Sequence, residues 1–268
     1  MNLFYCMGGG WGHLRRTRVF IDLLNISPVK VITASPLAER LFSSEELVMI
    51  DPNLSGDRKQ YNQRLSEIIS AENPVAFYID TFPCGILGEL KSVVFSPETN
   101  LYLVTRRVKW DNYRALACTM PFEKVFLLEE PEPGQLEYLR LCSQEVVTME
   151  LDYPVPERAE PVNFKRPMWL VVHGFVEEEV LSLVHYARDE AKLQEQWPEI
   201  VVISDCEIRE EGVEWRNEYP ASAWFPHAAR IFTAAGFNTI QETRPYRHKQ
   251  KIIPFPRKYD DQFWRSRE

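Results

Sequence analysis

The sequence MNLFYCMGGGWGHLRRTR (residues 1–18) joins an apolar run to a glycine-rich turn and then to an arginine-rich segment. The apolar run at 2–7 predicts a buried strand, and residues 13–25 have helical periodicity. Glycines between a strand and a helix let the backbone approach a ligand and present N–H groups at the positive end of the helix dipole. The stretch therefore predicts the first β–α unit of an α/β domain, with a ligand site at its turn.

The same alternation continues along the first half of the chain. Further apolar runs rich in Val, Ile, Phe and Tyr lie at 29–34, 47–50, 75–79, 100–105, 124–128 and 145–150. Helical patterns lie between many of them, at 36–43, 57–71 and 134–142. Continuous apolar strands that alternate with helices predict a parallel sheet covered on both faces, as in a Rossmann-like domain.

A proline-rich stretch then divides the chain. Residues 151–167 carry four prolines and no apolar periodicity, so we place a linker at 156–167. The alternation restarts with predicted strands at 168–175, 199–204, 213–215, 230–236 and 251–255, and helical segments at 176–197, 223–229, 238–247 and from 259. We predict an α/β protein of two Rossmann-like domains, 1–155 and 168–268, that face each other across a cleft.

Charge argues for a small anionic ligand and against a nucleic acid. The 268 residues carry a net charge of −8, whereas nucleic-acid binders present a broad basic face. Residues 177–218 hold 13 acidic and four basic side chains, and residues 244–268 hold eight basic and three acidic ones. A small basic patch in an acidic protein suits a small anion. A solvated helix face followed by a solvated tail explains the same pattern equally well.

Cysteine usage and hydropathy predict a cytoplasmic protein. The five cysteines stand far apart with no C-x-x-C pair, which predicts neither a zinc site nor a disulfide framework and fits a reducing compartment. No export signal is recognisable, and no apolar run reaches the roughly 18 residues of a membrane span. Nothing in the sequence supports membrane association.

The glycine turn does not match the dinucleotide fingerprint. His13 occupies the place of the third glycine, and the second strand ends at Ser35 with no carboxylate before Glu39 to hold a ribose. A histidine at the mouth of such a loop can act as a general base, or it can simply cap or pack the first helical turn. The nearby arginines, Arg15, Arg16 and Arg18, can meet phosphate or line the solvated side of the helix.

Asp80 directly follows the predicted strand at 75–79, within the stretch YIDTFPCG. The carboxyl ends of parallel strands form the edge where ligands bind in open α/β folds. Asp80 can therefore orient and charge-stabilise His13, as the carboxylate of a catalytic triad does, or it can cap a helix beginning near Gly85.

The strand at 230–236 runs into AAGFNTIQE, which predicts a diphosphate site. Asn238 and Thr239 stand where a helix begins after Gly236, so their N–H groups and the helix dipole can hold a diphosphate. Glu242, about one turn farther on, can accept both hydroxyls of a ribose. After the next strand, residues 260–262 (Asp-Asp-Gln) can bind a sugar by hydrogen bonds; ordinary caps and solvated side chains are the alternative for each.

The segments GGGWGHLRR and AAGFNTIQE…IIPFPRKYDDQ resemble the two signatures of GT-B-fold glycosyltransferases. In particular they are similar to the family of the N-acetylglucosaminyltransferase of peptidoglycan synthesis and of predicted bacterial transferases related to it. The resemblance implies inverting, metal-independent transfer of a sugar from a nucleotide diphosphate sugar, usually UDP-linked, to an acceptor hydroxyl. It implies no cofactor, a donor in the C-terminal domain and an acceptor in the N-terminal domain.

The predicted site residues fall into three groups. His13 and Asp80 are the catalytic candidates. The donor-binding candidates are Gly174, Gly236, Asn238, Thr239, Glu242, Asp261 and Gln262. The candidates for the acceptor or phosphate side are Gly9, Gly10, Gly12 and Arg16.

One departure from the family leaves other functions open. The strand that begins the second domain ends His173-Gly174-Phe175, where the family has a glycine- and serine-rich donor loop. A phosphate contact is then missing or supplied by His173. A UDP-sugar 2-epimerase-like enzyme and a non-catalytic nucleotide-sugar-binding protein therefore remain alternatives to a transferase.

Overall fold

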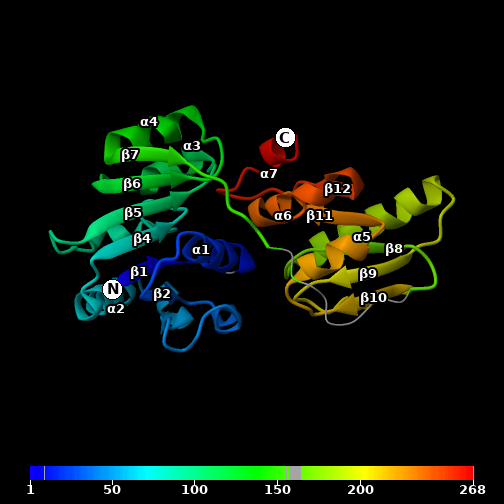
Figure 1. The fold of residues 1–268 in the computed structure, drawn as a ribbon, viewed down its shortest axis with the longest axis horizontal. Helices are drawn as coiled ribbons and strands as arrows, with labels where there is room; N and C mark the ends of the chain where they lie inside the picture. The colour runs from blue at the N-terminus through cyan, green and yellow to red at the C-terminus, as the bar shows by residue number, and fades with distance from the viewer. Residues whose placement is uncertain (9, 155, 157–163, 268) are drawn as a thin grey trace. The chain divides into compact units, whose positions relative to one another are not determined.

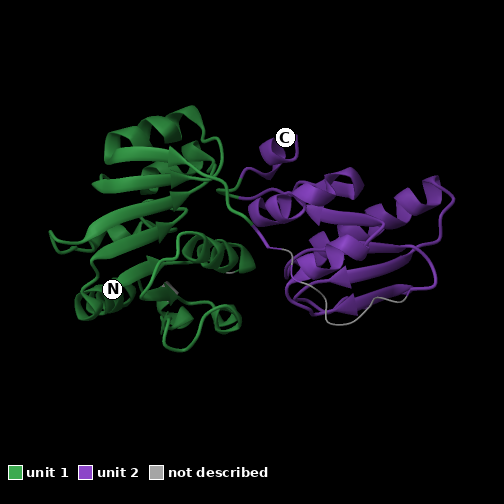
Figure 2. Cartoon of the chain, viewed as in Figure 1, with its two compact units in different colours: residues 1–152, 258–260 green, residues 153–257, 261–268 purple. Residues whose placement is uncertain are grey.

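The computed structural model describes residues 1–8, 10–154, 156 and 164–267, and the chain forms two compact units (Figures 1 and 2). Unit 1 comprises residues 1–152 and 258–260, and unit 2 comprises residues 153–257 and 261–268. Most of the predicted linker, residues 157–163, lies outside the described residues. Residues 258–260 belong to unit 1, although the sequence pattern assigns them to the second domain.

Unit 1 is built on a seven-stranded parallel sheet with the order β3-β2-β1-β4-β5-β6-β7. Its strands are β1 (Asn2–Tyr5), β2 (Val29–Thr33), β3 (Leu47–Met49), β4 (Ala76–Asp80), β5 (Asn100–Thr105), β6 (Phe122–Leu127) and β7 (Ser143–Thr148). Its α-helices are α1 (Trp11–Leu23), α2 (Arg58–Glu72), α3 (Trp110–Tyr113) and α4 (Pro133–Cys142). Short 3-10 helices are η1 (Pro36–Arg40), η2 (Pro52–Gly56), η3 (Glu89–Ser92) and η4 (Arg114–Leu116).

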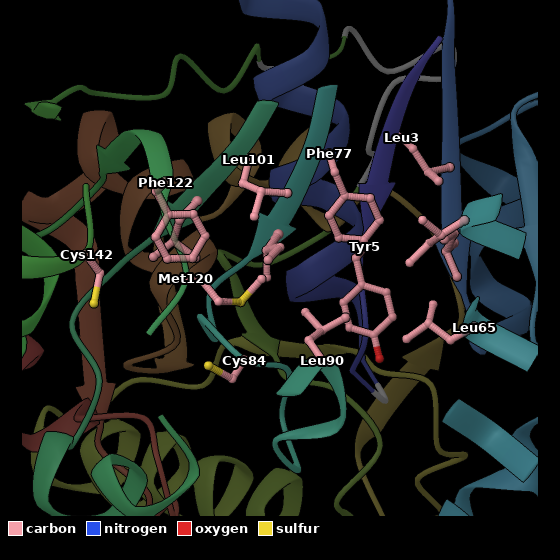
Figure 3. Packing of buried hydrophobic residues seen from close by; sticks show 14 of the residues in the cluster. Leu3, Tyr5, Leu65, Phe77, Cys84, Leu90, Leu101, Met120, Phe122 and Cys142 are labelled. Atoms are coloured by element: carbon pink, nitrogen blue, oxygen red, sulfur yellow. The ribbon is translucent and has the colours of Figure 1, made fainter. Parts of the chain in front are cut away.

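Alternate residues of these strands supply the two faces of the sheet. Leu3, Tyr5 and Phe77 join one buried cluster with Leu65 of α2 and Leu139 of α4, and Figure 3 shows much of this cluster from close by. On the other face Phe20 of α1 packs edge-on against Phe4 and Tyr78. Both faces carry apolar side chains, which is why the strands read as continuous apolar runs.

Unit 2 repeats the design with five parallel strands in the order β10-β9-β8-β11-β12. Its strands are β8 (Met168–Val172), β9 (Glu199–Ile203), β10 (Val213–Arg216), β11 (Arg230–Ala234) and β12 (Gln250–Ile253). Its helices are α5 (Glu177–Leu193), η5 (Ala221–His227), α6 (Phe237–Glu242), η6 (Arg244–Lys249) and α7 (Gln262–Arg265). Helix α5 packs on the Trp169 face of β8, and η5 packs on the Leu170 face. The two sheets confirm the predicted α/β architecture of Rossmann-like domains.

Several predicted helices are shorter or of another type. The pattern at 36–43 forms the 3-10 helix η1, and the helix predicted at 238–247 stops at Glu242 and gives way to η6, whose first turn holds Pro245. Proline lacks the backbone donor that a continuing α-helix needs. The final helix begins at Gln262 rather than Tyr259, because Tyr259 is built into unit 1.

The prediction of unpaired cysteines is wrong at two positions. Cys84 and Cys118, 34 residues apart in sequence, are joined by a disulfide in unit 1, and Cys6, Cys142 and Cys206 are free. Cys84 follows β4 and Cys118 precedes β6, so the packing of β4, β5 and β6 brings them together. No spacing motif records such a contact.

Replacing Cys118 with Ser tests the disulfide. In the chain-entropy account a cross-link over this separation stabilises by about 3–4 kcal/mol, so Cys118→Ser should lower the free energy of unfolding by that amount. Cys206→Ser, at a free cysteine of unit 2, is the control. In denaturant without reductant, three thiols should titrate in the wild type, one for each free cysteine; titration of all five cysteines would contradict the bond.

Candidate functional site

The glycine turn of unit 1 is shaped around His13. Helix α1 begins at Trp11 with Gly10 in an extended conformation at its N-cap, so His13 lies in the first turn. The imidazole lies against Gly8, where an added Cβ would stand 2.2 Å from His13 Cδ2 and 2.7 Å from Nε2. Only glycine permits this approach. The predicted Gly9 lies outside the described residues, and Gly12 lies in the first turn of α1.

Asp80 contacts His13 as one reading of the sequence predicts. It ends β4, and its Oδ2 forms a short hydrogen bond with Nδ1 of His13. A carboxylate can only accept a hydrogen bond, so a neutral imidazole that bonds to Asp80 in this way carries its proton on Nδ1 and its lone pair on Nε2. The His13 side chain is 18% exposed, whereas that of Asp80 is 4% exposed. Unit 1 therefore holds an oriented imidazole whose basic nitrogen is Nε2.

Arg16 bonds to both oxygens of the same carboxylate, and its Nη2 also lies 3.2 Å from Nδ1 of His13. Its Nε donates to Asp80 Oδ1 at 2.8 Å and its Nη2 donates to Oδ2 at 2.7 Å, which is a bidentate pair. Burial raises the pKa of Asp80, but the charges and hydrogen bonds of Arg16 and His13 outweigh it, and the pKa lies below its ordinary value. Arg16 is 2% exposed, so its guanidinium serves Asp80 rather than lining a solvated helix face.

Thr81 is a site residue that the sequence reasoning missed. Its φ is +64°, a left-handed conformation that β-branched residues rarely adopt. Arg16 Nη2 donates to its hydroxyl at 2.6 Å, and the Thr105 hydroxyl donates to its carbonyl at 2.8 Å. Strained backbone of this kind persists where the surroundings over-determine it, and it clusters at functional sites. The sequence gives no sign of this strain, because a threonine does not indicate a left-handed backbone conformation.

The loop after Thr81 is anchored on several sides. The Tyr113 hydroxyl accepts from the Cys84 N–H at 3.0 Å and donates to the Gly85 carbonyl at 2.8 Å. Phe82 lies 6.2 Å from the His13 ring and 5.4 Å from the ring of Tyr259, centroid to centroid. The segment 258–260 thus packs against the loop that follows Asp80 and Thr81.

Contacts at Tyr259 and Asp260 fasten this segment to the rest of unit 1. The Lys109 N–H donates to the Tyr259 carbonyl at 2.8 Å, and Asp260 pairs with Arg106. Asp260, which the sequence suggests as a sugar ligand, is therefore engaged in an ion pair. Neither contact is visible in the sequence, because more than 140 residues separate the partners.

In unit 2 the predicted diphosphate loop follows β11. Gly236 caps the short helix α6 in an extended conformation, and Asn238 accepts from the Tyr153 hydroxyl at 3.0 Å. Arg265, which is 2% exposed, donates to the Ala235 carbonyl at 2.7 Å and lies 5.9 Å from the Phe237 ring. A buried cation thus stands directly behind this loop. The sequence analysis did not single out Arg265.

The other donor candidates occupy this unit as well. Glu242 ends α6 and is partly exposed. Asp261 caps α7 by accepting from the Trp264 N–H at 3.1 Å. Gln262 is buried, and its amide oxygen accepts from the Phe255 N–H at 3.0 Å, which fixes the chain after β12. The contacts of Asp261 and Gln262 are those of a cap and a loop brace, and their roles toward a sugar stay predictions.

The loop after β8 carries an ion-pair cluster beside Gly174. His173 Nε2 lies 2.6 Å from Glu179 Oε2, and Arg257 Nη1 donates to Glu179 Oε1 at 2.5 Å. Burial lowers the pKa of His173, although Glu179 opposes the shift. Burial raises the pKa of Glu179, but the hydrogen bonds and charges of Arg257 and His173 outweigh this effect, so the pKa lies below its ordinary value. Glu179 therefore neutralises Arg257 and forms a hydrogen bond with His173, beside the loop that departs from the family pattern.

Replacing Asp80 with Asn tests the buried charge cluster. The variant leaves Arg16 buried without its counter-charge, so the free energy of unfolding should fall by about 3–5 kcal/mol near neutral pH. The folded pKa of Asp80 lies below the unfolded value of about 3.9, so its contribution is present above that value and lost as pH falls through the folded pKa. Urea unfolding of both proteins at several pH values should show the difference shrinking in acid.

The exposed Asp111 supplies the control. Asp111→Asn removes a carboxylate whose side chain is 85% exposed and should change stability by no more than about 0.5 kcal/mol. An equally small effect of Asp80→Asn would show that the cluster contributes nothing to stability.

Comparison with known proteins identifies the fold. The sequence matches no protein-family model and no curated protein. Among solved structures, the glycotransferase of kitacinnamycin is 15% identical, with 99% of this chain and 82% of that chain covered and a TM-score of 0.60. A putative UDP-N-acetylglucosamine 2-epimerase from Listeria monocytogenes is 10% identical, with 87% and 74% covered and a TM-score of 0.54. MurG from Acinetobacter baumannii is 11% identical, with 95% and 78% covered and a TM-score of 0.51.

These structures share an architecture and little sequence. None of the helices in the described part of this chain has both the length and the apolar character that a membrane crossing requires.

The two parallel sheets, their strand orders and the likeness to glycosyltransferases and to a 2-epimerase lead to one conclusion. This chain has the α/β fold of the GT-B type, built from two Rossmann-like units.

Proposed function

We propose that this chain is a glycosyltransferase that moves a sugar from a nucleotide diphosphate sugar, UDP-linked in our proposal, to an acceptor hydroxyl. The observation that carries the proposal is the buried Asp80 carboxylate, which orients His13 through Nδ1 and is itself held by Arg16. Carboxylate–imidazole pairs of this kind serve general-base catalysis in unrelated enzymes. The fold supports this class of substrate, since solved structures that share it include glycosyltransferases.

In this proposal Nε2 of His13 takes the proton of the acceptor hydroxyl. The hydroxyl oxygen attacks the anomeric carbon as the bond from that carbon to the diphosphate oxygen breaks, and the nucleoside diphosphate leaves with that electron pair. A single displacement from the opposite face inverts the anomeric centre. Asp80 stabilises the imidazolium that forms, and Arg16 and Thr81 act as positioning residues that keep Asp80 charged and in place.

The donor side of the proposal rests on unit 2. The loop Ala235–Thr239 follows β11, and the buried Arg265 donates to its Ala235 carbonyl. In this proposal the backbone N–H groups of the loop bind the diphosphate without a metal ion. Glu242 binds the ribose hydroxyls, and Asp261 and Gln262 lie nearer the sugar. The region around Gly174 contributes less, because Glu179 already pairs with His173 and Arg257.

Calorimetric titration with UDP, TDP, GDP and NAD tests the donor site. One nucleoside diphosphate should bind, and Glu242→Ala should weaken it by about 1–3 kcal/mol, the usual cost of leaving buried polar partners unpaired. Glu211→Ala, on an exposed loop of the same unit, is the control. Preferential binding of NAD would point to a dehydrogenase and overturn the proposal.

Replacing His13 separates a transferase from a nucleotide-sugar sensor. With the donor identified by titration and a panel of acceptor alcohols, His13→Ala should lower turnover by about 10²–10⁴-fold and leave donor affinity unchanged. Gly8→Ala should act in the same direction with little loss of stability, because its Cβ displaces the movable imidazole rather than backbone. Gly56→Ala, whose Cβ meets nothing within 4 Å, is the control.

The products decide between transfer and epimerisation. Incubation with the donor alone should yield no 2-epimer, and transfer should require an acceptor. An unaltered rate in His13→Ala would remove His13 as the base, and accumulation of a 2-epimer would favour the epimerase, whose fold this chain shares.

A further inference from the structure

A cavity lies in unit 2, away from the predicted donor loops. It has a volume of about 610 Å³, within the usual range for small-molecule sites, and its lining includes Trp169, Gln196, Trp197, Arg230, His248 and Lys249. Trp169 and Arg230 stand at the amino ends of β8 and β11, whereas Gly174 and Gly236 follow the carboxyl ends of the same strands. Five strand residues, about 16 Å, separate the two edges of the sheet.

The titratable side chains that line the cavity are all basic. Among the described residues of the lining, Arg230, His248 and Lys249 are present and no carboxylate is. Behind the wall, Glu190 lies 3.9 Å from Arg230 and 2.9 Å from Lys251, so two cations share one carboxylate. The local charge is therefore positive, although the whole chain carries −8.

Lys249 adds a cation whose hydrogen-bond partners are neutral. Its ammonium donates to the Ala228 carbonyl at 2.6 Å and the Pro226 carbonyl at 3.3 Å, and it lies 5.0 Å from the Tyr246 ring. No carboxylate in the described part of the chain pairs with it. Burial lowers the pKa of Lys249, which reflects the cost of holding this charge without a counter-ion. An anion in the cavity would remove that cost.

Two tryptophans line the cavity, and one of them, Trp197, presents an exposed ring. Trp169 is buried and is covered by the Arg230 guanidinium, which stands 5.2 Å from its ring. Trp197, in the turn between α5 and β9, is 69% exposed. An indole face beside cations accepts an aromatic ring by stacking, or the apolar C–H face of a sugar ring by packing, while the cations hold an attached acidic group. The amide of Gln196 adds a donor and an acceptor.

We propose that this cavity binds a small anion that carries a ring, with the ring against Trp197 and the acidic group between Arg230 and Lys249. Two sources have this chemistry, a nucleotide, with its base and phosphate, and an acidic sugar, with its pyranose ring and carboxylate. The site is separate from the proposed donor site and does not depend on it. It also accounts for part of the basic patch seen in residues 244–268.

Titration of the whole chain with adenosine monophosphate and with glucuronate, followed by the indole N–H signals in NMR, tests the site. At least one probe should bind and shift the Trp197 signal. Trp197→Ala and Arg230→Gln should each weaken that binding by about tenfold or more. Both variants avoid Lys249, whose ammonium holds two backbone carbonyls, and melting temperatures should confirm that they stay folded.

Two control variants make the result specific. Arg209→Gln removes an exposed cation on another loop of unit 2, and Glu242→Ala removes the proposed ribose ligand. Neither should weaken binding at this cavity, whereas loss in Glu242→Ala alone would place the probe at the donor site and overturn the proposal. So would the absence of binding up to about 10 mM of either probe, or equal weakening by Arg209→Gln, which would mark nonspecific charge attraction. Binding of one probe and not the other identifies the source of the ligand.

Discussion

The buried charge of Asp80 is the constraint around which the proposed catalytic part of unit 1 is built. A carboxylate at the end of an inner strand is costly unless other groups compensate it, and here Arg16 and His13, one helical turn apart on α1, approach it together. Their spacing of three residues places both on one side of the helix. The helix must then begin immediately after the glycine turn, and Gly8 must lack a side chain so that the imidazole can lie against it.

The surroundings of Asp80 extend this order to distant parts of the chain. Thr81 takes a left-handed conformation that hydrogen bonds from Arg16 and Thr105 compensate. The following loop is tied down by Tyr113, by the bond between Cys84 and Cys118, and by Tyr259 from near the end of the chain. A loop held at so many points keeps the carboxylate in one position, which is what a group that orients a catalytic base requires.

Unit 2 handles charge differently at the two edges of its sheet. At the carboxyl edge, Glu179 neutralises Arg257 and bonds to His173, and Arg265 lies buried behind the loop after β11. At the amino edge, Arg230, His248 and Lys249 gather around a cavity with no acidic lining residue among those described. The acidic stretch at 177–218 and the basic stretch at 244–268 therefore meet in some places as ion pairs, such as Glu190 with Lys251, and leave cations in others.

The sequence by itself determined the α/β class, the strands and the positions of Asp80 and His13 at a sheet edge, because apolar periodicity and glycine turns are local properties. It left open whether Asp80 reaches His13 or caps a helix, and the fold decided this by bringing β4 beside β1. The disulfide, the strain at Thr81, the place of Tyr259 in unit 1 and the buried Arg265 came only from the tertiary structure. Each of these features depends on a contact between residues far apart in the chain or on a backbone angle. Such contacts and angles do not change the pattern of apolar and polar residues from which secondary structure is predicted.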